Sequence, residues 1–229
     1  MAGCGGRLGV IFDMDGVLVD TGWAHRQAWL DLGAREGLPM TDELFRSTFG
    51  MQNNAILPML RPGISDPEME RLANWKERRY REVVQERPEL APGVIPLLKD
   101  LRQHGFRLAV GSSAPPENLD IFWHGASLQE YFDARVTNEE VRESKPSPQT
   151  FLRAAEKLGL APACCAVVED AVPGVQAGRA AGMIVVAVTT TRKREDLAKA
   201  DYIADSLTEL NATDFLALLQ PPGGRTCRR

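Results

Sequence analysis

Short apolar runs alternate with amphipathic segments over much of the chain. The runs at 8–12, 107–112, 165–169 and 183–188 are rich in β-branched residues, which is typical of buried parallel strands. Apolar residues at helical spacing lie between these runs, at Val94, Leu97, Leu98 and Leu101 and again at Phe151, Leu152 and Ala155. This alternation predicts an α/β fold with a parallel sheet and helices on both faces, because consecutive parallel strands need right-handed crossovers.

The segment after the first strand has a different pattern. It carries no strand signal. Apolar residues have helical spacing at 21–37 and again after Asp66 and Pro67. We expect Asp66 at the N-cap of the second helix and Pro67 at its first helical position. We therefore expect a small helical domain inserted into the α/β core. The expected ranges are 1–19 and 91–220 for the core, 20–90 for the helical domain and 221–229 for a disordered tail.

Composition and charge narrow the classes of partner. The 229 residues carry a formal net charge of -4, and the one basic stretch, 76–81, also holds an acid, so no nucleic-acid surface is expected. No apolar run approaches the roughly 20 residues of a membrane span, and residues 1–7 lack the apolar stretch of a signal peptide. Cys164 and Cys165 are neighbours entering an apolar strand, which favours small core residues in a reducing compartment. We expect a cytoplasmic, soluble monomer without a membrane or nucleic-acid partner.

Two carboxylates, Asp13 and Asp15, stand at the end of the first apolar run. Residues two apart on an extended chain share a face, and ligands of parallel sheets collect at the carboxyl ends of strands. Two like charges about 4 Å apart repel by roughly 4 kcal/mol at an effective dielectric near 20. A hard divalent cation with oxygen ligands would relieve this repulsion. A solvated acidic turn, punctuated by Gly16, is the other interpretation.

Further polar residues follow the later apolar runs. Ser112 ends the second run, Lys145 stands before Pro146, and Glu169 and Asp170 end the third. Taken singly, these residues also fit a turn serine, a surface lysine and a helix N-cap. Their order along the chain carries more information than any one of them.

The segment Asp13–Thr21, with Ser112, Lys145 and the Glu169–Asp170 pair, resembles the four signatures of the haloacid dehalogenase superfamily in the order of that superfamily. The resemblance covers roughly residues 9–219 and implies a Rossmann-like core with an inserted cap. Within the superfamily, the chain is similar to the branch of β-phosphoglucomutase and small sugar-phosphate phosphatases.

The resemblance implies a set of catalytic roles. Asp13 would attack phosphorus and form an aspartyl phosphate, Asp15 would act as general acid and base, and Lys145 would neutralise charge. The Ser112 hydroxyl would hold a phosphoryl oxygen. Mg²⁺ suits the expected oxygen ligands better than zinc, because no His/Cys cluster is present. The expected metal ligands are Asp13, Asp15 (through its backbone carbonyl), Glu169 and Asp170.

The resemblance also implies substrate contacts, which we expect at His25, Asn53, Lys76 and Ser113. Lys76 falls within an apolar helical stripe, which fits either a group that faces a ligand or a lysine that snorkels from a packed face. His25 lies beside tryptophans, where a core or interface histidine is also expected. The mutase carries an arginine for a second phosphate, and Asn53 stands at that place here. An amide lacks the charge-assisted bidentate bonds of arginine.

We therefore expect a Mg²⁺-dependent phosphohydrolase for a small phosphorylated metabolite such as a sugar phosphate. The first alternative is an intramolecular phosphotransferase of the β-phosphoglucomutase type, which would share every catalytic residue. The second is a non-catalytic member that binds a phosphorylated ligand, although binding alone needs no second aspartate. Conversion of 2-haloacids is disfavoured, because the Glu169–Asp170 pair would have no purpose there.

Overall fold

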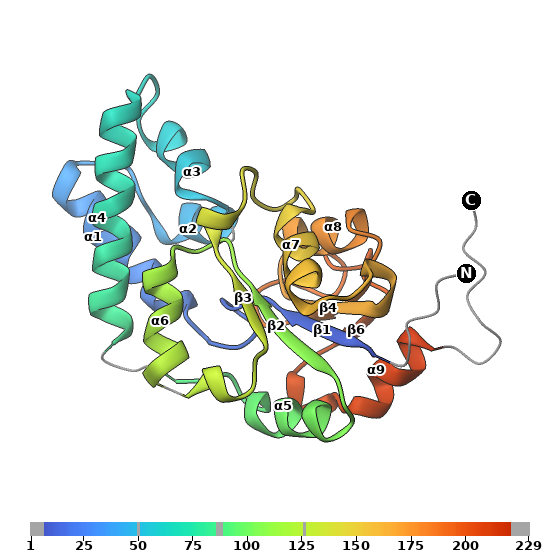
Figure 1. The fold of residues 1–229 in the computed structure, drawn as a ribbon. Helices are drawn as coiled ribbons and strands as arrows, with labels where there is room; N and C mark the ends of the chain where they lie inside the picture. Colours follow the sequence, from blue (N-terminus) through green and yellow to red (C-terminus); the bar gives the residue numbers. More distant parts are fainter. Residues whose placement is uncertain (1–6, 50, 86–88, 126, 221–229) are drawn as a thin grey trace. The chain divides into compact units, whose positions relative to one another are not determined.

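The chain forms two compact units, one made of Met1–Val19 with Leu90–Arg229 and the other of Asp20–Glu89. The computed structural model describes residues 7–49, 51–85, 89–125 and 127–220 (Figure 1). The second unit coincides, except for residue 90, with the segment predicted to be helical. The tail predicted at 221–229 lies outside the described residues.

A six-stranded parallel sheet, in the order β3-β2-β1-β4-β5-β6, forms the centre of the first unit. The predicted α/β class with a Rossmann-like parallel sheet is confirmed. β1 is hydrogen-bonded to β2 and β4, with Phe12 in register with Val110 and Val168. The strands are β1 Gly9–Phe12, β2 Arg107–Gly111, β3 Ala134–Val136, β4 Cys165–Glu169, β5 Ile184–Val188 and β6 Tyr202–Ala204.

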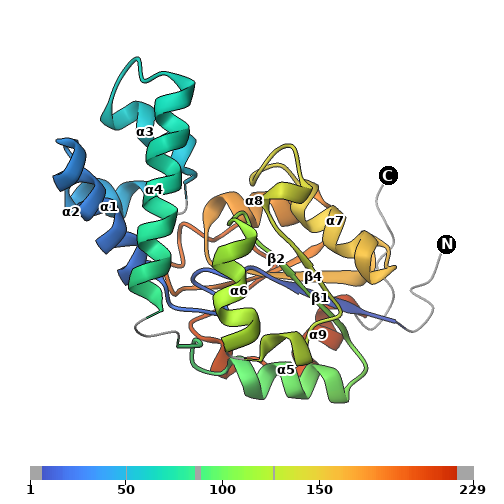
Figure 2. The ribbon, with the colours of Figure 1, turned by 60° about the vertical axis from the view of Figure 1, so that its left-hand side comes forward.

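Helices cover both faces of this sheet, with α7 and α8 on one face and α5 and α9 on the other (Figures 1 and 2). Ile11 and Val167 of the sheet pack with Phe151 of α7 and Ala177 of α8 in one buried cluster. The helices of this unit are α5 Val94–Gln103, α6 Pro116–Gly125, α7 Gln149–Leu158, α8 Val172–Ala180 and α9 Ala212–Leu219. Short 3₁₀ turns are η1 Leu128–Glu130, η2 Asn138–Glu140, η3 Pro162–Cys164 and η4 Leu207–Glu209.

The described residues of the second unit form the helices α1 Gly22–Glu36, α2 Asp42–Thr48, α3 Asn53–Leu60 and α4 Asp66–Val84. Trp29, Leu32, Leu57 and Leu72 form part of its buried core, with α1 packed against α4. The helix predicted at Asp66 is present, but Ser65 occupies the N-cap and Asp66 lies in the first turn. Within the described residues of the chain, none of the helices combines the length and the apolarity that crossing a bilayer requires.

Candidate active site

The polar residues that follow the central strands lie at one edge of the sheet. Asp13 follows β1 directly, Ser112 follows β2, and Glu169 is the last residue of β4. The backbone N–H of Asp13 donates to Val168 O at 2.9 Å, so the β1–β4 ladder extends to the first acidic residue. Because neighbouring parallel strands end at the same edge, residues distant in sequence meet at the place where such sheets bind ligands.

Lys145 contacts carboxylates from two of the predicted catalytic segments, those of Asp13 and Glu169. Its Nζ donates to Asp13 Oδ1 at 2.6 Å and to Glu169 Oε1 at 2.7 Å, and all three side chains are largely buried. The ammonium also lies 4.7 Å from the centre of the Phe151 ring. The surface-lysine interpretation of Lys145 is therefore wrong, and its charge is held against two carboxylates away from solvent.

The buried charges shift one another's pKa values. Burial raises the pKa of Asp13 most strongly, the ammonium of Lys145 opposes this, and the charge of Glu169 adds to it, so that the pKa of Asp13 lies at about 7. Burial alone would lower the pKa of Lys145, but attraction to Asp13 and Glu169 outweighs it and raises that pKa above its ordinary value. Lys145 therefore stays cationic throughout the pH range in which Asp13 ionises.

Backbone N–H groups also hold the Glu169 carboxylate in place. Its Oε2 accepts hydrogen bonds from the N–H groups of Asp170, at 3.0 Å, and Ala171, at 3.1 Å, just before α8 begins. A Cβ atom on Gly174 would lie 1.8 Å from Glu169 Oε1, so the carboxylate fits against the first turn of α8 only because residue 174 is glycine. The helix N-terminus favours the charge of Glu169.

Asp170 completes a carboxylate cluster. Carboxylate oxygens of Asp13, Glu169 and Asp170 lie within 4.8 Å of one another. Burial and repulsion from Glu169 and Asp13 hold the pKa of Asp170 well above its usual value, although a hydrogen bond from the Thr191 hydroxyl opposes this shift. Three carboxylates against the one ammonium of Lys145 leave two negative charges when all are ionised, which a divalent cation would balance. The oxygen-only donor set fits Mg²⁺.

Asp15 is half-buried and lies outside the three-carboxylate cluster. Asp15 forms an isolated parallel β-bridge with Val19. The N–H of Gly16 donates to Val19 O at 2.8 Å, which closes the loop after β1. Gly16 has a φ of +81°, a backbone conformation that favours glycine. The turn thus holds Asp15 in a closed loop, two residues after Asp13.

The two serines after β2 differ in their hydrogen bonding. Ser112 is buried, and its Oγ accepts a hydrogen bond from the N–H of Ala114 at 3.0 Å. Ser113 Oγ is buried without a hydrogen-bond partner among the described residues. Leaving a buried hydroxyl unpaired costs about 1–3 kcal/mol. A ligand oxygen at this site would remove that cost.

The helical unit brings its three predicted ligand residues together, although the chain separates them widely. Lys76 Nζ lies 2.8 Å from His25 Nδ1 and donates to Glu77 Oε1 at 2.8 Å, and Asn53 Nδ2 donates to the same oxygen at 2.8 Å. The His25 ring stacks on Tyr80 with 4.0 Å between the ring centres. Lys76 is 2% exposed, which excludes a solvated position for its ammonium.

Glu77 is a member of this cluster that the sequence did not reveal. Burial alone would raise the pKa of Glu77, but the charges of Lys76 and His25 and the hydrogen bonds from Lys76 and Asn53 lower it to about 2. Glu77 is therefore ionised at neutral pH and pairs with Lys76. Adjacent residues on a helix do not normally face each other, so the sequence contained no signal for this pair.

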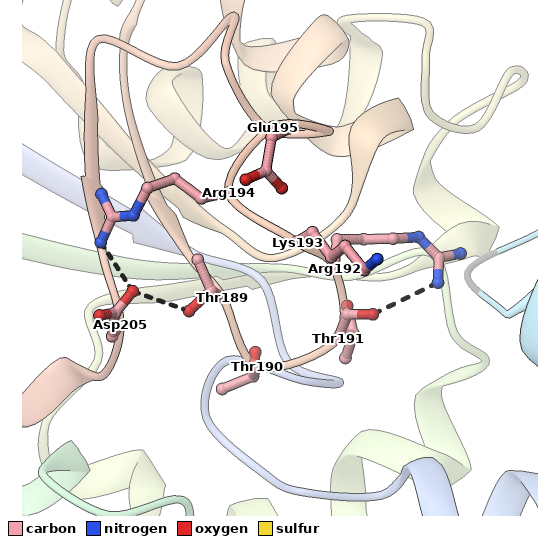
Figure 3. Close-up of a pocket in the computed structure, with 8 residues that line it drawn as sticks. All are labelled: Thr189, Thr190, Thr191, Arg192, Lys193, Arg194, Glu195 and Asp205. Atoms are coloured by element: carbon pink, nitrogen blue, oxygen red, sulfur yellow. Dashed lines mark hydrogen bonds and ion pairs between the residues drawn. The ribbon is translucent and has the colours of Figure 1, made fainter.

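The loop after β5 also reaches the acidic edge, through residues that the sequence did not single out. Thr190 Oγ1 donates to Gly16 O, and Thr191 Oγ1 donates to the Asp170 carboxylate. A shallow pocket of about 540 Å³ borders this loop and is lined by residues 189–195 and Asp205 (Figure 3). On the pocket wall, the guanidinium of Arg194 is paired with the Asp205 carboxylate at 2.6 Å.

Comparisons with known proteins show which family the chain resembles in sequence. The sequence profile of the haloacid dehalogenase-like hydrolases matches residues 8–182. Hexitol phosphatase B of Escherichia coli (strain K12) is 32% identical over 215 residues, which cover 91% of this chain and 96% of that protein. Fructose-1-phosphate phosphatase YqaB of the same strain is 34% identical over 182 residues, or 79% of this chain and 95% of that protein.

A solved structure resembles the chain over almost its whole length. The crystal structure of β-phosphoglucomutase from Clostridium difficile has a TM-score of 0.82 at 26% sequence identity and covers 92% of this chain and 96% of that chain. The stretch matched by the family profile contains Asp13, Lys145, Glu169 and Asp170.

Proposed function

The chain belongs to the haloacid dehalogenase-like hydrolases, and from this premise we propose that it is a Mg²⁺-dependent phosphatase of sugar or sugar-alcohol monophosphates that acts through an aspartyl phosphate on Asp13. One observation carries the proposal: the buried cluster in which Lys145 contacts Asp13 and Glu169, with Asp170 beside them. The phosphatase relatives support the chemical class of the substrate.

The carboxylates of Asp13, Glu169 and Asp170 and the backbone carbonyl of Asp15 would hold the magnesium ion. When bound, the ion supplies positive charge that offsets the repulsion between the anionic nucleophile and the phosphate. With all three carboxylates ionised, the cluster would hold two negative charges beyond the one that Lys145 balances, and a divalent cation would offset them.

In the first step, an oxygen of Asp13 attacks phosphorus as the bond between phosphorus and the sugar oxygen breaks. Asp15 donates its proton to the departing sugar oxygen. In the second step, Asp15 takes a proton from water, the water oxygen attacks phosphorus, and Asp13 leaves as a free carboxylate together with inorganic phosphate.

Other residues of the chain hold the reacting groups. Lys145 orients Asp13 and favours its ionised form, because its ammonium contacts the carboxylate directly. Ser112 and the unpaired hydroxyl of Ser113 would bind oxygens of the transferring phosphoryl group. We propose that His25, Asn53 and Lys76 contact the remainder of the substrate.

Two features of the helical unit favour hydrolysis over phosphoryl transfer between two sugar hydroxyls. Asn53 stands where the mutase carries an arginine, and the Lys76 charge is already balanced by Glu77 at 2.8 Å. A bisphosphate intermediate needs a positively charged group to bind its second phosphate, whereas a neutral polyol needs hydrogen-bond donors and acceptors. The cluster of Asn53, Lys76 and Glu77 provides the latter.

The direct test of the substrate class is phosphate release from a panel of monophosphates with Mg²⁺. We expect kcat/KM for hexitol phosphates, fructose 1-phosphate or related sugar phosphates to exceed that for phosphoglycolate and phosphoserine by at least about tenfold, equivalent to about 1.4 kcal/mol of transition-state binding. Equal rates across the panel would exclude a sugar-selective site. No release from any of them would exclude the phosphatase.

Removing both charges of the Lys76–Glu77 pair should separate substrate recognition from chemistry. The double variant Lys76→Met/Glu77→Gln avoids leaving one buried charge unpaired, which costs about 3–5 kcal/mol. We expect KM for sugar phosphates to rise about tenfold and kcat/KM for p-nitrophenyl phosphate to change less than about twofold. Arg78→Gln, an exposed change on the same helix, is the matched control. An equal loss on both substrates would contradict a role in sugar binding.

Metal binding should depend on pH through Asp13. Its pKa lies at about 7 without the ion, so the carboxyl holds a proton near pH 6 and must release it to bind a cation, whereas near pH 8 it is ionised. We expect Mn²⁺ to bind at least about tenfold more weakly at pH 6 than at pH 8, since each displaced proton changes affinity about tenfold per pH unit below the pKa. Titration followed by electron paramagnetic resonance measures this, and an affinity independent of pH would be inconsistent with it.

A further inference from the structure

Three successive threonines after β5 donate to three different parts of the core unit. Thr189 Oγ1 donates to Asp205 Oδ1 at 3.1 Å, Thr190 Oγ1 to Gly16 O, and Thr191 Oγ1 to Asp170 Oδ2. Figure 3 shows the three side chains along one loop and the bond between Thr189 and Asp205. Two of the three hydroxyls therefore reach the acidic edge and one does not.

Thr191 holds Asp170 closely. Its Oγ1 lies 3.1 Å from Asp170 O as well as in hydrogen-bond contact with Oδ2. Asp170 is 2% exposed, and the hydrogen bond from Thr191 falls on its Oδ2. With Oδ2 taken by the threonine, Oδ1 is the oxygen left for a cation.

The methyl group of Thr191 is packed as well as its hydroxyl. A Cβ atom on Gly16 would lie 2.1 Å from Asp170 Oδ2 and 3.0 Å from Thr191 Cγ2. The loop after β1, the Asp170 carboxylate and the Thr191 side chain are thus in mutual contact. Rotation of the carboxylate would break the Thr191 hydrogen bond, and little free space surrounds it on the Gly16 side.

We propose that Thr191 is a positioning residue for the metal centre, which fixes the Asp170 carboxylate in the orientation that binds the cation. The inference rests on the proposed function, since it assumes that Asp170 is a metal ligand. Hydrogen-bond partners of metal ligands orient them, and their removal typically weakens metal binding by about 10–100-fold. Thr190 donates to the carbonyl of Gly16, the residue after Asp15, and so holds the neighbouring loop.

The test is Mn²⁺ binding, measured from the electron paramagnetic resonance signal of the free ion, so that it does not depend on turnover. Thr191→Val keeps the shape and removes the hydroxyl, whereas Thr191→Ser keeps the hydroxyl and removes the methyl group. Thr189→Val makes the same chemical change two residues earlier, where the hydroxyl donates to Asp205 and not to the carboxylate cluster. Circular dichroism and thermal unfolding check that each variant is folded, and Thr191→Ala replaces Thr191→Val if the valine variant is not.

We expect Thr191→Val to weaken Mn²⁺ binding at least about tenfold, with Thr191→Ser and Thr189→Val within about threefold of the wild type. At saturating Mg²⁺, kcat of Thr191→Val should return to within about threefold of the wild type, because the positioning effect lies in metal affinity. Unchanged Mn²⁺ affinity in a folded Thr191→Val, or an equal loss in Thr189→Val, would overturn the inference. A wild-type protein that binds no Mn²⁺ would instead overturn the proposed metal centre itself.

Discussion

Asp13→Asn is expected to lower phosphate release by at least about a thousandfold while the protein stays folded. The amide is a poor nucleophile at phosphorus, lacks the charge that a metal ligand supplies and no longer pairs with Lys145 at 2.6 Å. Release of phosphate from the best substrate of the panel, measured on protein with a native circular dichroism spectrum, gives the result.

The matched control for this substitution is Asp196→Asn, which makes the same change at an exposed carboxylate after β5. It should keep turnover within about twofold of the wild type, since surface substitutions usually have small effects. An Asp13→Asn variant that retained a tenth of wild-type turnover would exclude Asp13 as the nucleophile.

Removal of the metal should have the second largest effect. Exhaustive treatment with EDTA is expected to reduce activity by at least about a thousandfold, because the buried carboxylates would then repel the phosphate dianion with Lys145 alone to offset them. Adding Mg²⁺ should restore the original rate.

The experiment follows phosphate release during chelation and re-addition, with metal content determined by elemental analysis. Unfolding is excluded by recording circular dichroism on the chelated protein. Full activity in a sample shown to be free of divalent metal would rule out the proposed mechanism.

The central strands could be predicted from sequence because burial on both faces leaves a continuous apolar signal. β1, β4 and β5 are buried along their whole length, and their predicted positions agree with the structure within one residue. The edge strands β3 and β6 gave no such signal. Each has three residues, of which only the last is buried, so their sequences resemble those of loops.

The acidic residues of the core site could also be predicted, because the sheet topology determines where they lie. Parallel topology brings the carboxyl ends of strands together, so acids after β1 and β4 were expected to meet, and Asp13, Glu169 and Asp170 do so. Lys145 required the family resemblance, because a lysine before proline has no local signature of burial.

Contacts between separate loops or within a helix turn were not predictable. Glu77 meets Asn53 across 24 residues of chain, and Thr191 meets Asp170 across 21. Glutamate on an amphipathic helix and threonine after a strand are common on solvated surfaces, so neither residue type in its local context indicates a buried partner. Only the tertiary packing reveals which acid or hydroxyl is enclosed.

The fate of β-glucose 1-phosphate, supplied with Mg²⁺ and a trace of glucose 1,6-bisphosphate, tests most directly whether water or a sugar hydroxyl takes the phosphoryl group from Asp13. Inorganic phosphate and glucose 6-phosphate are measured in the same reaction. The neutral pair of Lys76 and Glu77 and the amide of Asn53 provide no strong grip for a second phosphate, so we expect phosphate to form faster than glucose 6-phosphate. Faster accumulation of glucose 6-phosphate would contradict the hydrolase assignment and identify a phosphotransferase.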